Sequence, residues 1–311
     1  MKDIGKDSVT KLEVDHGSDG QRIDNLLMRL LKGVPKSHVY RILRSGEVRL
    51  NSRRVTPSAK VVKGDILRIP PVRISQKSEV TELPRFKLDI LFEDEAIIAI
   101  DKPAGVAVHG GSGVSGGVIE ILRLTRTDQD FLELVHRLDK ETSGVLLLAK
   151  SRQALLSLHQ QIRDGNTEKF YQAVVHGTDF VDKSIRHPLR KFVNKAGERK
   201  VVVDGTGQDA LTVVKKLEVG AKATLVEAEL KTGRTHQIRV HLAHEYFPII
   251  GDEKYGDFYI NRRYAKMKIK RMLLHAVSFT FTHPKTKKRV TIRSDTPGEF
   301  GIAVKMNEVE N

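Results

Sequence analysis

The chain has 311 residues, of which 39% are hydrophobic, enough for one large domain with a smaller companion. Lys and Arg number 54 against 39 Asp and Glu, so the formal net charge is +15 and nucleic acid is the first partner to consider. Cysteine is absent, which excludes structural disulfides, Cys-based zinc sites and thiol nucleophiles.

The first residues, MKDIGKDSVTKLEV, mix charged with apolar side chains and lack the continuous apolar core of a signal peptide. No segment approaches the roughly 20 apolar residues that a membrane span needs. We therefore expect a cytoplasmic protein that does not contact a membrane.

Two short helices and a set of short strands are predicted for residues 20–70. Apolar residues recur at helical spacing in QRIDNLLMRLL and again in SHVYRILR. A turn at Asn51 and Ser52 separates short strands, and VKGDILRIP is typical of a Gly-Asp turn that enters a closing strand. Basic residues gather on the second helix and around that turn, at Arg41, Arg44, Arg53 and Arg54. Their concentration favours a phosphate-contacting surface over a merely solvated face.

The pattern QRIDNLLMRLL…SHVYRILRSGEVRLNSRRV…VVKGDILRIP resembles an S4-type RNA-binding domain, and the resemblance implies that this unit binds structured RNA. Pro70, Pro71 and the polar stretch VRISQKSEVTELPR then interrupt the periodicity, as a linker does. We place the boundary near Arg85. An S4-like domain with its linker is thus predicted over residues 1–85, and a second domain over residues 86–311.

The second domain is predicted to contain more strands than helices. Strands are expected at LDILFED, AIIAIDKP, GVLLLAK, FYQAVVHG and TLVEAEL, and LLHAVSFTFTHPKTKKRVTIRS is typical of a hairpin. A glycine-rich loop, HGGSGVSGG, leads into the amphipathic VIEILRLT, and a further helix is marked by apolar residues from Ala154 to Ile162 and ends near Gly165. KTGRTHQIRVH is expected to be a basic turn. Short turns between strands predict an α+β fold, with helices packed on a mixed, mainly antiparallel sheet.

The segment LVHRLDKETSGVLLLAK places Asp139 in a charged turn directly before a buried strand. A cation as near as Arg137 would lower a carboxyl pKa by roughly one to three units, so that Asp139 stays ionised as a nucleophile or general base. The alternative is a turn aspartate that only accepts backbone N–H groups. A kinase catalytic loop is excluded, because it requires His-Arg-Asp and a downstream Asp-Phe-Gly. The glycine-rich loop lacks the Gly-Lys-Ser/Thr ending of a Walker phosphate loop.

Two further segments carry candidate functional residues. In EKFYQAVVHG, alternation places Tyr171 on the face of the strand that carries small apolar residues, which suits either a core ring or a site. In KTGRTHQIRVH, the candidates are Arg234 and Arg239. His236 and His241 are five residues apart, a spacing that disfavours metal chelation, so no metal site is expected.

Together the three segments resemble the RluA-like branch of the pseudouridine synthase family, over residues 88–294. The resemblance implies a pseudouridine synthase fold and an isomerase that converts uridine in RNA to pseudouridine without a cofactor. By the family pattern, Asp139 is the catalytic carboxylate, Tyr171 stacks under the uracil, and Arg239 is the basic partner of Asp139. Either Arg239 or, as the second choice, Arg234 would hold the carboxylate.

The family pattern also implies RNA contacts. Arg137 would enter the space that the extruded base leaves, and base extrusion costs a few kcal/mol. The expected RNA-binding residues are Arg137, Arg234 and His136 near the site, with Arg41, Arg44, Arg53 and Arg54 in the S4-like domain.

Within the family, the S4-like domain and the stretches KGVPKS, PPVR and VHGGSG favour the branch that modifies large-subunit (23S) ribosomal RNA. That RNA is the expected partner of a monomeric enzyme, and residues 191–209, which depart from the pattern, leave another structured RNA open. A non-catalytic RNA-binding or ribosome-assembly protein would also bind RNA, but it would tolerate loss of Asp139. A glycosidase that pairs Asp139 with Glu141 is a weak alternative.

Overall fold

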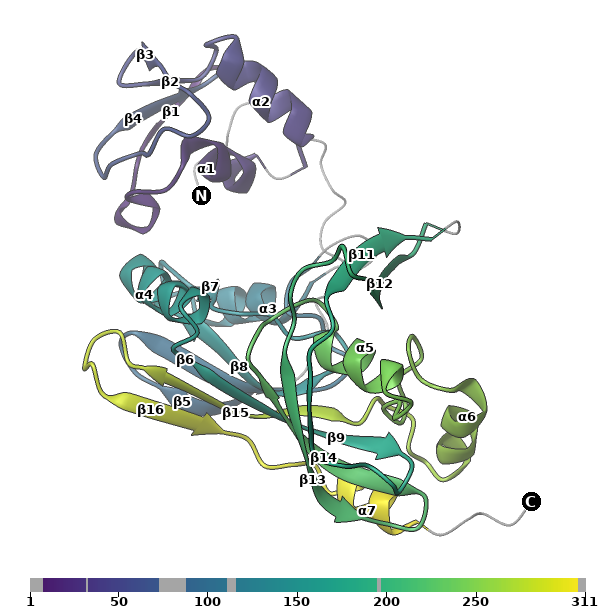
Figure 1. Ribbon diagram of the computed structural model, residues 1–311. Coiled ribbons are helices and arrows are strands. Elements are labelled where there is room, and N and C mark those ends of the chain that lie inside the picture. Colours follow the sequence, from purple (N-terminus) through teal and green to yellow (C-terminus); the bar gives the residue numbers. More distant parts are fainter. Residues whose placement is uncertain (1–7, 32, 73–87, 111–115, 195–196, 307–311) are drawn as a thin grey trace. The chain divides into compact units, whose positions relative to one another are not determined.

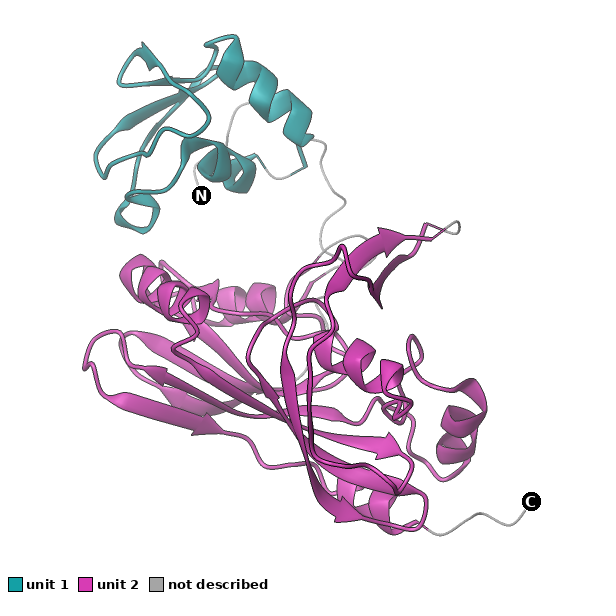
Figure 2. Ribbon diagram, viewed as in Figure 1, with its two compact units in different colours: residues 1–84 teal, residues 85–311 magenta. Residues whose placement is uncertain are grey.

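The computed structural model describes residues 8–31, 33–72, 88–110, 116–194 and 197–306. The chain divides into two compact units, Met1–Pro84 and Arg85–Asn311, and each has a hydrophobic core of its own (Figure 2). The boundary near Arg85 and most of the predicted linker fall in residues 73–87, outside the described residues, and so do residues 111–115 of the glycine-rich loop. Pro70 and Val72, where the linker was expected to begin, are instead buried, and Val72 belongs to the core of the N-terminal unit. In the described ranges, no helix combines the length and apolar character that a membrane span requires.

The N-terminal unit packs two helices against a four-stranded sheet with the order β1-β4-β2-β3. Its elements are β1 (Thr10–Glu13), a short 3-10 helix (His16–Ser18), α1 (Ile23–Leu30), α2 (Lys36–Arg44), β2 (Arg49–Leu50), β3 (Arg53–Arg54) and β4 (Ile66–Ile69). Both predicted helices are confirmed, and each buries the apolar face that its spacing indicated. The two residues of the predicted turn, Asn51 and Ser52, both have positive φ angles, as a tight hairpin requires.

The C-terminal unit is built on a ten-stranded sheet. The strands are β5 (Asp89–Glu93), β6 (Ile97–Lys102), β7 (Glu133–Leu134), β8 (Ser143–Ala149), β9 (Glu168–His176), β10 (Lys183–Ile185), β13 (Thr212–Val219), β14 (Ala223–Leu230), β15 (Leu274–Thr282) and β16 (Arg289–Arg293). Their order is β10-β13-β14-β9-β15-β8-β6-β5, with β16 beside β15 and β7 beside β8 (Figure 1). Among the strands described, only β15 and β8 pair in parallel, so the predicted mixed, mainly antiparallel sheet is confirmed.

Helices cover this sheet through three apolar clusters. The helices are α3 (Val118–Thr125), α4 (Arg152–Arg163), α5 (Gln237–His244), α6 (Phe258–Lys266) and α7 (Glu299–Lys305). Residues of α3 and α5 share a cluster with β6, β8 and β9, whereas α4 packs with β8 and β15. Helices α6 and α7 bury side chains with β9 and β14. The hairpin of β11 (Leu189–Val193) and β12 (Arg199–Val203) is a separate two-stranded sheet.

The expectation of a basic turn at KTGRTHQIRVH is wrong in its second half, because α5 begins at Gln237. The Gln237 side chain fixes this start: its oxygen accepts from Arg234 N at 3.0 Å, and its amide donates to Leu211 O at 3.0 Å. Val240 packs against the β11–β12 hairpin, while Ile238 lies in the main core. Opposite faces of α5 are therefore buried, and the amphipathic pattern that normally reveals a helix is missing.

Gly144 allows the close approach of β8 and β15. It has φ +105°, and a Cβ placed on it would collide with the backbone of Ala276, its partner in the parallel register. Only glycine combines this backbone conformation with so small a distance between strands. The position is close to a candidate site residue, because β8 begins four residues after Asp139.

Gly144→Ala is expected to lower the free energy of unfolding by about 2–5 kcal/mol, because it adds backbone strain and overpacking. Gly165→Ala is the matched control: Gly165 also has positive φ, but the space around its Cβ position is open. The control should cost only about 1–2 kcal/mol. Denaturant unfolding of both variants measures the difference, and equal losses would contradict a steric role for Gly144.

Candidate active site

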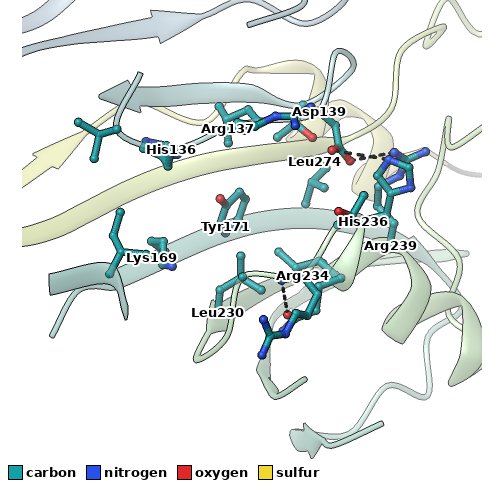
Figure 3. A pocket seen from close by; sticks show the side chains of 18 of the residues that line it. His136, Arg137, Asp139, Lys169, Tyr171, Leu230, Arg234, His236, Arg239 and Leu274 are labelled. Atoms are coloured by element: carbon teal, nitrogen blue, oxygen red, sulfur yellow. Dashed lines mark hydrogen bonds and ion pairs between the residues drawn. The ribbon is translucent and has the colours of Figure 1, made fainter. Parts of the chain in front are cut away.

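A pocket of about 410 Å³ in the C-terminal unit brings together the three segments that the sequence singled out (Figure 3). One wall is formed by residues 135–139 and Thr142, another by residues 233–239, and Lys169 and Tyr171 contribute from β9. The sheet order explains this meeting, because β15 lies between β8 and β9 and adds Leu274 to the lining.

Asp139 is held on a short turn with anchored ends. Its carbonyl accepts from Thr142 N at 3.2 Å, and Leu138 and Thr142 on either side are buried. Strand β8 then runs through the core with every residue buried. The Asp139 side chain is 26% exposed and lines the pocket. An accessible carboxylate is therefore attached to a fixed backbone.

Lys102, at the end of β6, forms hydrogen bonds that hold the same turn. Its fully buried Nζ donates to Pro103 O and Val106 O at 2.8 Å each and to Lys140 O at 3.0 Å. Burial lowers the pKa of Lys102 to about 7. The three bonds tie β6 and its following loop to the residue after Asp139.

Arg239, on the first turns of α5, is the ion-pair partner of Asp139. Its Nη1 donates to Asp139 Oδ2 at 2.9 Å. The other edge of the guanidinium forms a two-bond pair with Asp252, from Nε to Oδ2 at 2.7 Å and from Nη2 to Oδ1 at 2.8 Å. Of the two arginines proposed from the sequence, Arg239 is therefore the one that pairs with Asp139.

The electrostatics of this trio favour full charge on the arginine. Burial opposes charge on Arg239, but the hydrogen bonds and charges of Asp252 and Asp139 raise its pKa. Burial likewise opposes charge on Asp252, and its bonds to Arg239 and to the N–H groups of Lys254 and Tyr255 lower its pKa. A planar guanidinium with paired edges can hardly rotate, so Asp139 receives a donor in a fixed direction.

His236 lies near the second carboxylate oxygen of Asp139, with its Nε2 3.7 Å from Oδ1. It precedes α5 in the left-handed conformation, at φ 53°, which is uncommon for a residue other than glycine. Its Nδ1 lies 2.8 Å from the Tyr255 hydroxyl, which accepts from Val201 N of β12 at 3.0 Å. Burial lowers the pKa of His236, so a neutral ring with its proton on Nε2 fits these partners.

Tyr171 is buried, with 7% of its surface exposed, and shares a cluster with Ala173 and Val175 of the same strand, as alternation predicted. Burial and the charge of Asp139 raise the pKa of Tyr171. The phenol therefore stays protonated near neutral pH and offers a ring face and a neutral hydroxyl rather than a phenolate. Lys169, two residues earlier, lines the same pocket.

The remaining predicted site residues have different surroundings. Arg137 is exposed and lines the pocket, but the ion pair that we expected from it belongs to Arg239. Arg234 lines the pocket and donates from Nε to Asp209 O at 2.9 Å. His136 accepts from Leu147 N at 3.1 Å, and burial lowers its pKa to about 3, so it enters the pocket wall as a neutral ring.

The basic residues predicted in the N-terminal unit are exposed around the end of α2 and the β2–β3 turn: Arg41, Arg44, Arg53 and Arg54. The Arg54 side chain packs on Gly46, which follows α2, so the turn and the helix end form one surface. The positive charge of Arg41 is partly neutralised by an ion pair, because its Nη1 lies 3.1 Å from Glu47 Oε1.

Sequence reasoning missed Asp252, Tyr255, Lys102 and Lys169, and it considered His236 only as a metal ligand. Lys169 could have been found, because strand alternation puts it on the face of Tyr171. Asp252 and Tyr255 gave no signal, since both follow α5 in an irregular segment. In the described part of the chain, no three His, Cys, Asp or Glu side chains gather as metal ligands would.

Comparisons with known proteins agree on one family. Residues 96–244 match the family described as RNA pseudouridylate synthase, and residues 21–67 match the S4 domain. The chain is 47% identical over 297 residues to a Pasteurella multocida protein named Ribosomal large subunit pseudouridine synthase C, with 93% of this chain and 90% of that protein covered. It is 45% identical to the protein of the same name from Escherichia coli K12, with 98% of each covered. The resemblances read from the sequence are thus confirmed.

Two solved structures support the fold. Human RNA Pseudouridylate Synthase Domain Containing 1 aligns with a TM-score of 0.55 at 22% identity, over 71% of this chain and 86% of that one. Human RNA Pseudouridylate Synthase Domain Containing 4 aligns with a TM-score of 0.54 at 25% identity, over 68% and 90%.

Asp252→Asn is expected to lower the free energy of unfolding by about 3 kcal/mol, because it leaves the buried Arg239 charge with one carboxylate. The folded pKa of Asp252 lies below its unfolded value near 3.9, so the stabilisation is present above about pH 4 and is lost as pH falls through the folded pKa. Thermal unfolding across pH 3–7 measures this. Asp139→Asn, at the exposed end of Arg239, should cost about 1 kcal/mol; equal losses would show that Asp252 has no special role.

Proposed function

The chain belongs to the RNA pseudouridylate synthase family, and we propose that it isomerises specific uridines of large-subunit (23S) ribosomal RNA to pseudouridine. The choice of RNA is supported by relatives named for the ribosomal large subunit, which the chain matches over nearly its whole length. The net charge of +15 suits a polyanionic substrate. The observation that carries the chemistry is the accessible Asp139 carboxylate, paired with buried Arg239 beside the Tyr171 ring.

The isomerisation requires a group that acts at the sugar while the base turns. The N1–C1′ bond breaks, the uracil rotates, a C5–C1′ bond forms, and the proton on C5 leaves while N1 gains one. Atoms and electrons balance within the nucleotide and water, without an oxidant or a phosphate donor. Asp139 would act either as a nucleophile at C1′ or as a base toward a sugar proton, and both roles need an ionised carboxylate with an open oxygen.

The surroundings of Asp139 suit both roles. Arg239 occupies Oδ2 from a fixed direction and stabilises the anion, while Oδ1 faces the pocket and His236. Tyr171 would stack under the detached uracil and hold it within reach of C1′. Because the phenol stays protonated, it would contribute its ring face and a neutral donor, and water or another pocket group would take the C5 proton.

Entry of a uridine into this pocket requires its extrusion from the RNA, at a cost of a few kcal/mol. Exposed Arg137, at the rim beside Asp139, would fill the vacated space, and Arg234 and Lys169 would contact the neighbouring backbone. The S4-like unit would add affinity through the surface around Arg54 and the end of α2. The enzyme would act as a monomer, and a ribosomal RNA substrate supports a cytoplasmic location.

Asp139→Asn is expected to abolish pseudouridine formation, a loss of about a thousandfold or more, because the amide keeps the shape but cannot carry the charge. The measurement is a map of pseudouridines in ribosomal RNA from cells that lack the chain and are complemented with parent or variant. Glu141→Gln is the matched control, since Glu141 lies two residues away with 47% of its side chain exposed. Turnover of the Asp139 variant within tenfold of the parent would refute the assignment, and loss in the control would favour paired carboxylates.

Removal of residues 1–84 is expected to weaken binding to ribosomal RNA and to flatten its salt dependence, by about 0.7–0.9 in logarithmic slope for each phosphate that the shortened chain no longer neutralises. The C-terminal unit has its own core, so it should stay folded. Binding against salt, and turnover on a short model RNA and on long ribosomal RNA, test this. Activity on the short RNA should survive better, whereas an unchanged slope or equal losses would make the N-terminal unit a structural appendage.

A further inference from the structure

Residues 258–271 form a one-sidedly basic part of the C-terminal unit that the pocket does not use. This stretch, FYINRRYAKMKIKR, contains six Lys and Arg and no Asp or Glu. Arg271 turns inward, where it donates to Ser143 Oγ at 2.6 Å. Most of the other basic side chains are exposed on α6 and on the residues just after it.

Helix α6 has an inner face that accounts for its folding. Tyr264 is buried in the cluster that also contains residues of α7, and Ile260 and Met267 pack against it at helical spacing. The Asp257 side chain caps the helix by accepting from Ile260 N at 3.0 Å. Side chains on the outer face are therefore not required to hold the helix in place.

The outer face of α6 presents two large aromatic rings that the fold leaves in solvent. Phe258 is 70% exposed and Tyr259 is 76% exposed, and their rings meet edge to face with centroids 5.6 Å apart. One and two turns further along the same face lie the exposed basic residues. We call these five residues the α6 platform: Phe258, Tyr259, Arg262, Arg263 and Lys266.

Exposed aromatic rings beside cationic side chains match the chemistry of single-stranded RNA. Unpaired bases stack on Phe and Tyr rings whatever their sequence, while Arg and Lys contact the adjacent phosphates. A protein partner that recognised so basic a helix would need an acidic surface, whereas one strand of RNA supplies both the phosphates for the basic side chains and the bases for the rings. Charge and ring content together favour RNA.

The α6 platform is joined rigidly to the catalytic network. Asn261, on the flank of α6, accepts from Gly251 N at 2.7 Å and donates to Asp252 O at 2.9 Å. Asp252 is the residue that fixes Arg239, and Arg239 holds Asp139. A strand of RNA bound on the outside of α6 would thus lie at a constant position relative to the reacting carboxylate.

We propose that the α6 platform is a second RNA-binding surface, which stacks unpaired nucleotides of the substrate outside the target uridine and contacts their phosphates. This inference rests on the proposed function, because it assumes that the substrate is RNA. It adds a specificity element to the catalytic unit, apart from the S4-like unit, that selects RNAs in which single-stranded nucleotides accompany the target.

Two double variants of the full chain separate stacking from charge. Phe258→Ala with Tyr259→Ala should weaken binding to a large-subunit ribosomal RNA fragment by about tenfold or more, with an unchanged salt slope, because rings carry no charge. Arg262→Gln with Lys266→Gln should flatten the slope by about 0.7 for each phosphate of single-stranded RNA that is no longer neutralised. Filter binding at several salt concentrations measures both.

The matched control is Lys287→Gln with Lys288→Gln, which removes the same charge from the turn between β15 and β16. The control should change affinity and slope much less than the α6 variants. Equal effects in control and α6 variants would reduce the platform to general electrostatics and overturn the proposal. Weakened binding to assembled ribosomal particles but not to protein-free RNA would also overturn it, in favour of a protein contact.

Parent turnover distinguishes this proposal from the function on which it rests. If the parent forms pseudouridine and the α6 variants bind RNA like the parent, only the platform is refuted. If the parent forms none, the proposed function is refuted, and the binding measurements still decide whether α6 contacts RNA. Thermal unfolding of the two α6 variants should match the parent, since none of their four substituted side chains belongs to a buried cluster.

Discussion

The buried guanidinium of Arg239 is the interaction on which the rest of the site depends. It lies between two carboxylates, and only Asp139 reaches solvent, so the inner pair serves orientation while the outer pair remains available for chemistry. A single Arg–Asp pair at the surface would move and be screened by salt. Because Arg239 is buried and also paired with Asp252, its guanidinium cannot move in this way. The two ion pairs therefore hold α5, the Asp252 segment and the Asp139 turn in one arrangement.

Much of this arrangement could be predicted from the sequence. Periodicity located both N-terminal helices and most strands of the C-terminal sheet, because each of these elements buries one face or runs wholly through the core. Strands β7, β10 and β13 were not predicted. Helix α5 could not be predicted in this way, since Ile238 and Val240 are buried on different sides. Asp252 and Tyr255 were not predicted as site residues for another reason. They lie in an irregular segment whose position only the tertiary fold determines, so no local sequence pattern marks them.

The family assignment and the geometry answer different questions. Similarity over nearly the whole chain establishes the type of reaction, but it does not say which side chain orients which. The structure supplies that order: Lys102 supports the turn, Asp252 fixes Arg239, Arg239 directs Asp139, and Tyr171 lines the same pocket. The orientation of Asp139 thus depends on several residues joined by hydrogen bonds, and not on the motif residues alone.

The β11–β12 hairpin forms a two-stranded sheet of its own, and it meets the site through Val201 N, which donates to the Tyr255 hydroxyl, and through Val240 of α5, which packs against it. Residues added to or removed from its tip would leave the register of the ten-stranded sheet untouched, because no strand of that sheet uses the hairpin as a partner. The hairpin is therefore a place where evolutionary drift in length and charge costs little stability. Related enzymes could diverge there in RNA preference while the reaction itself stays constant.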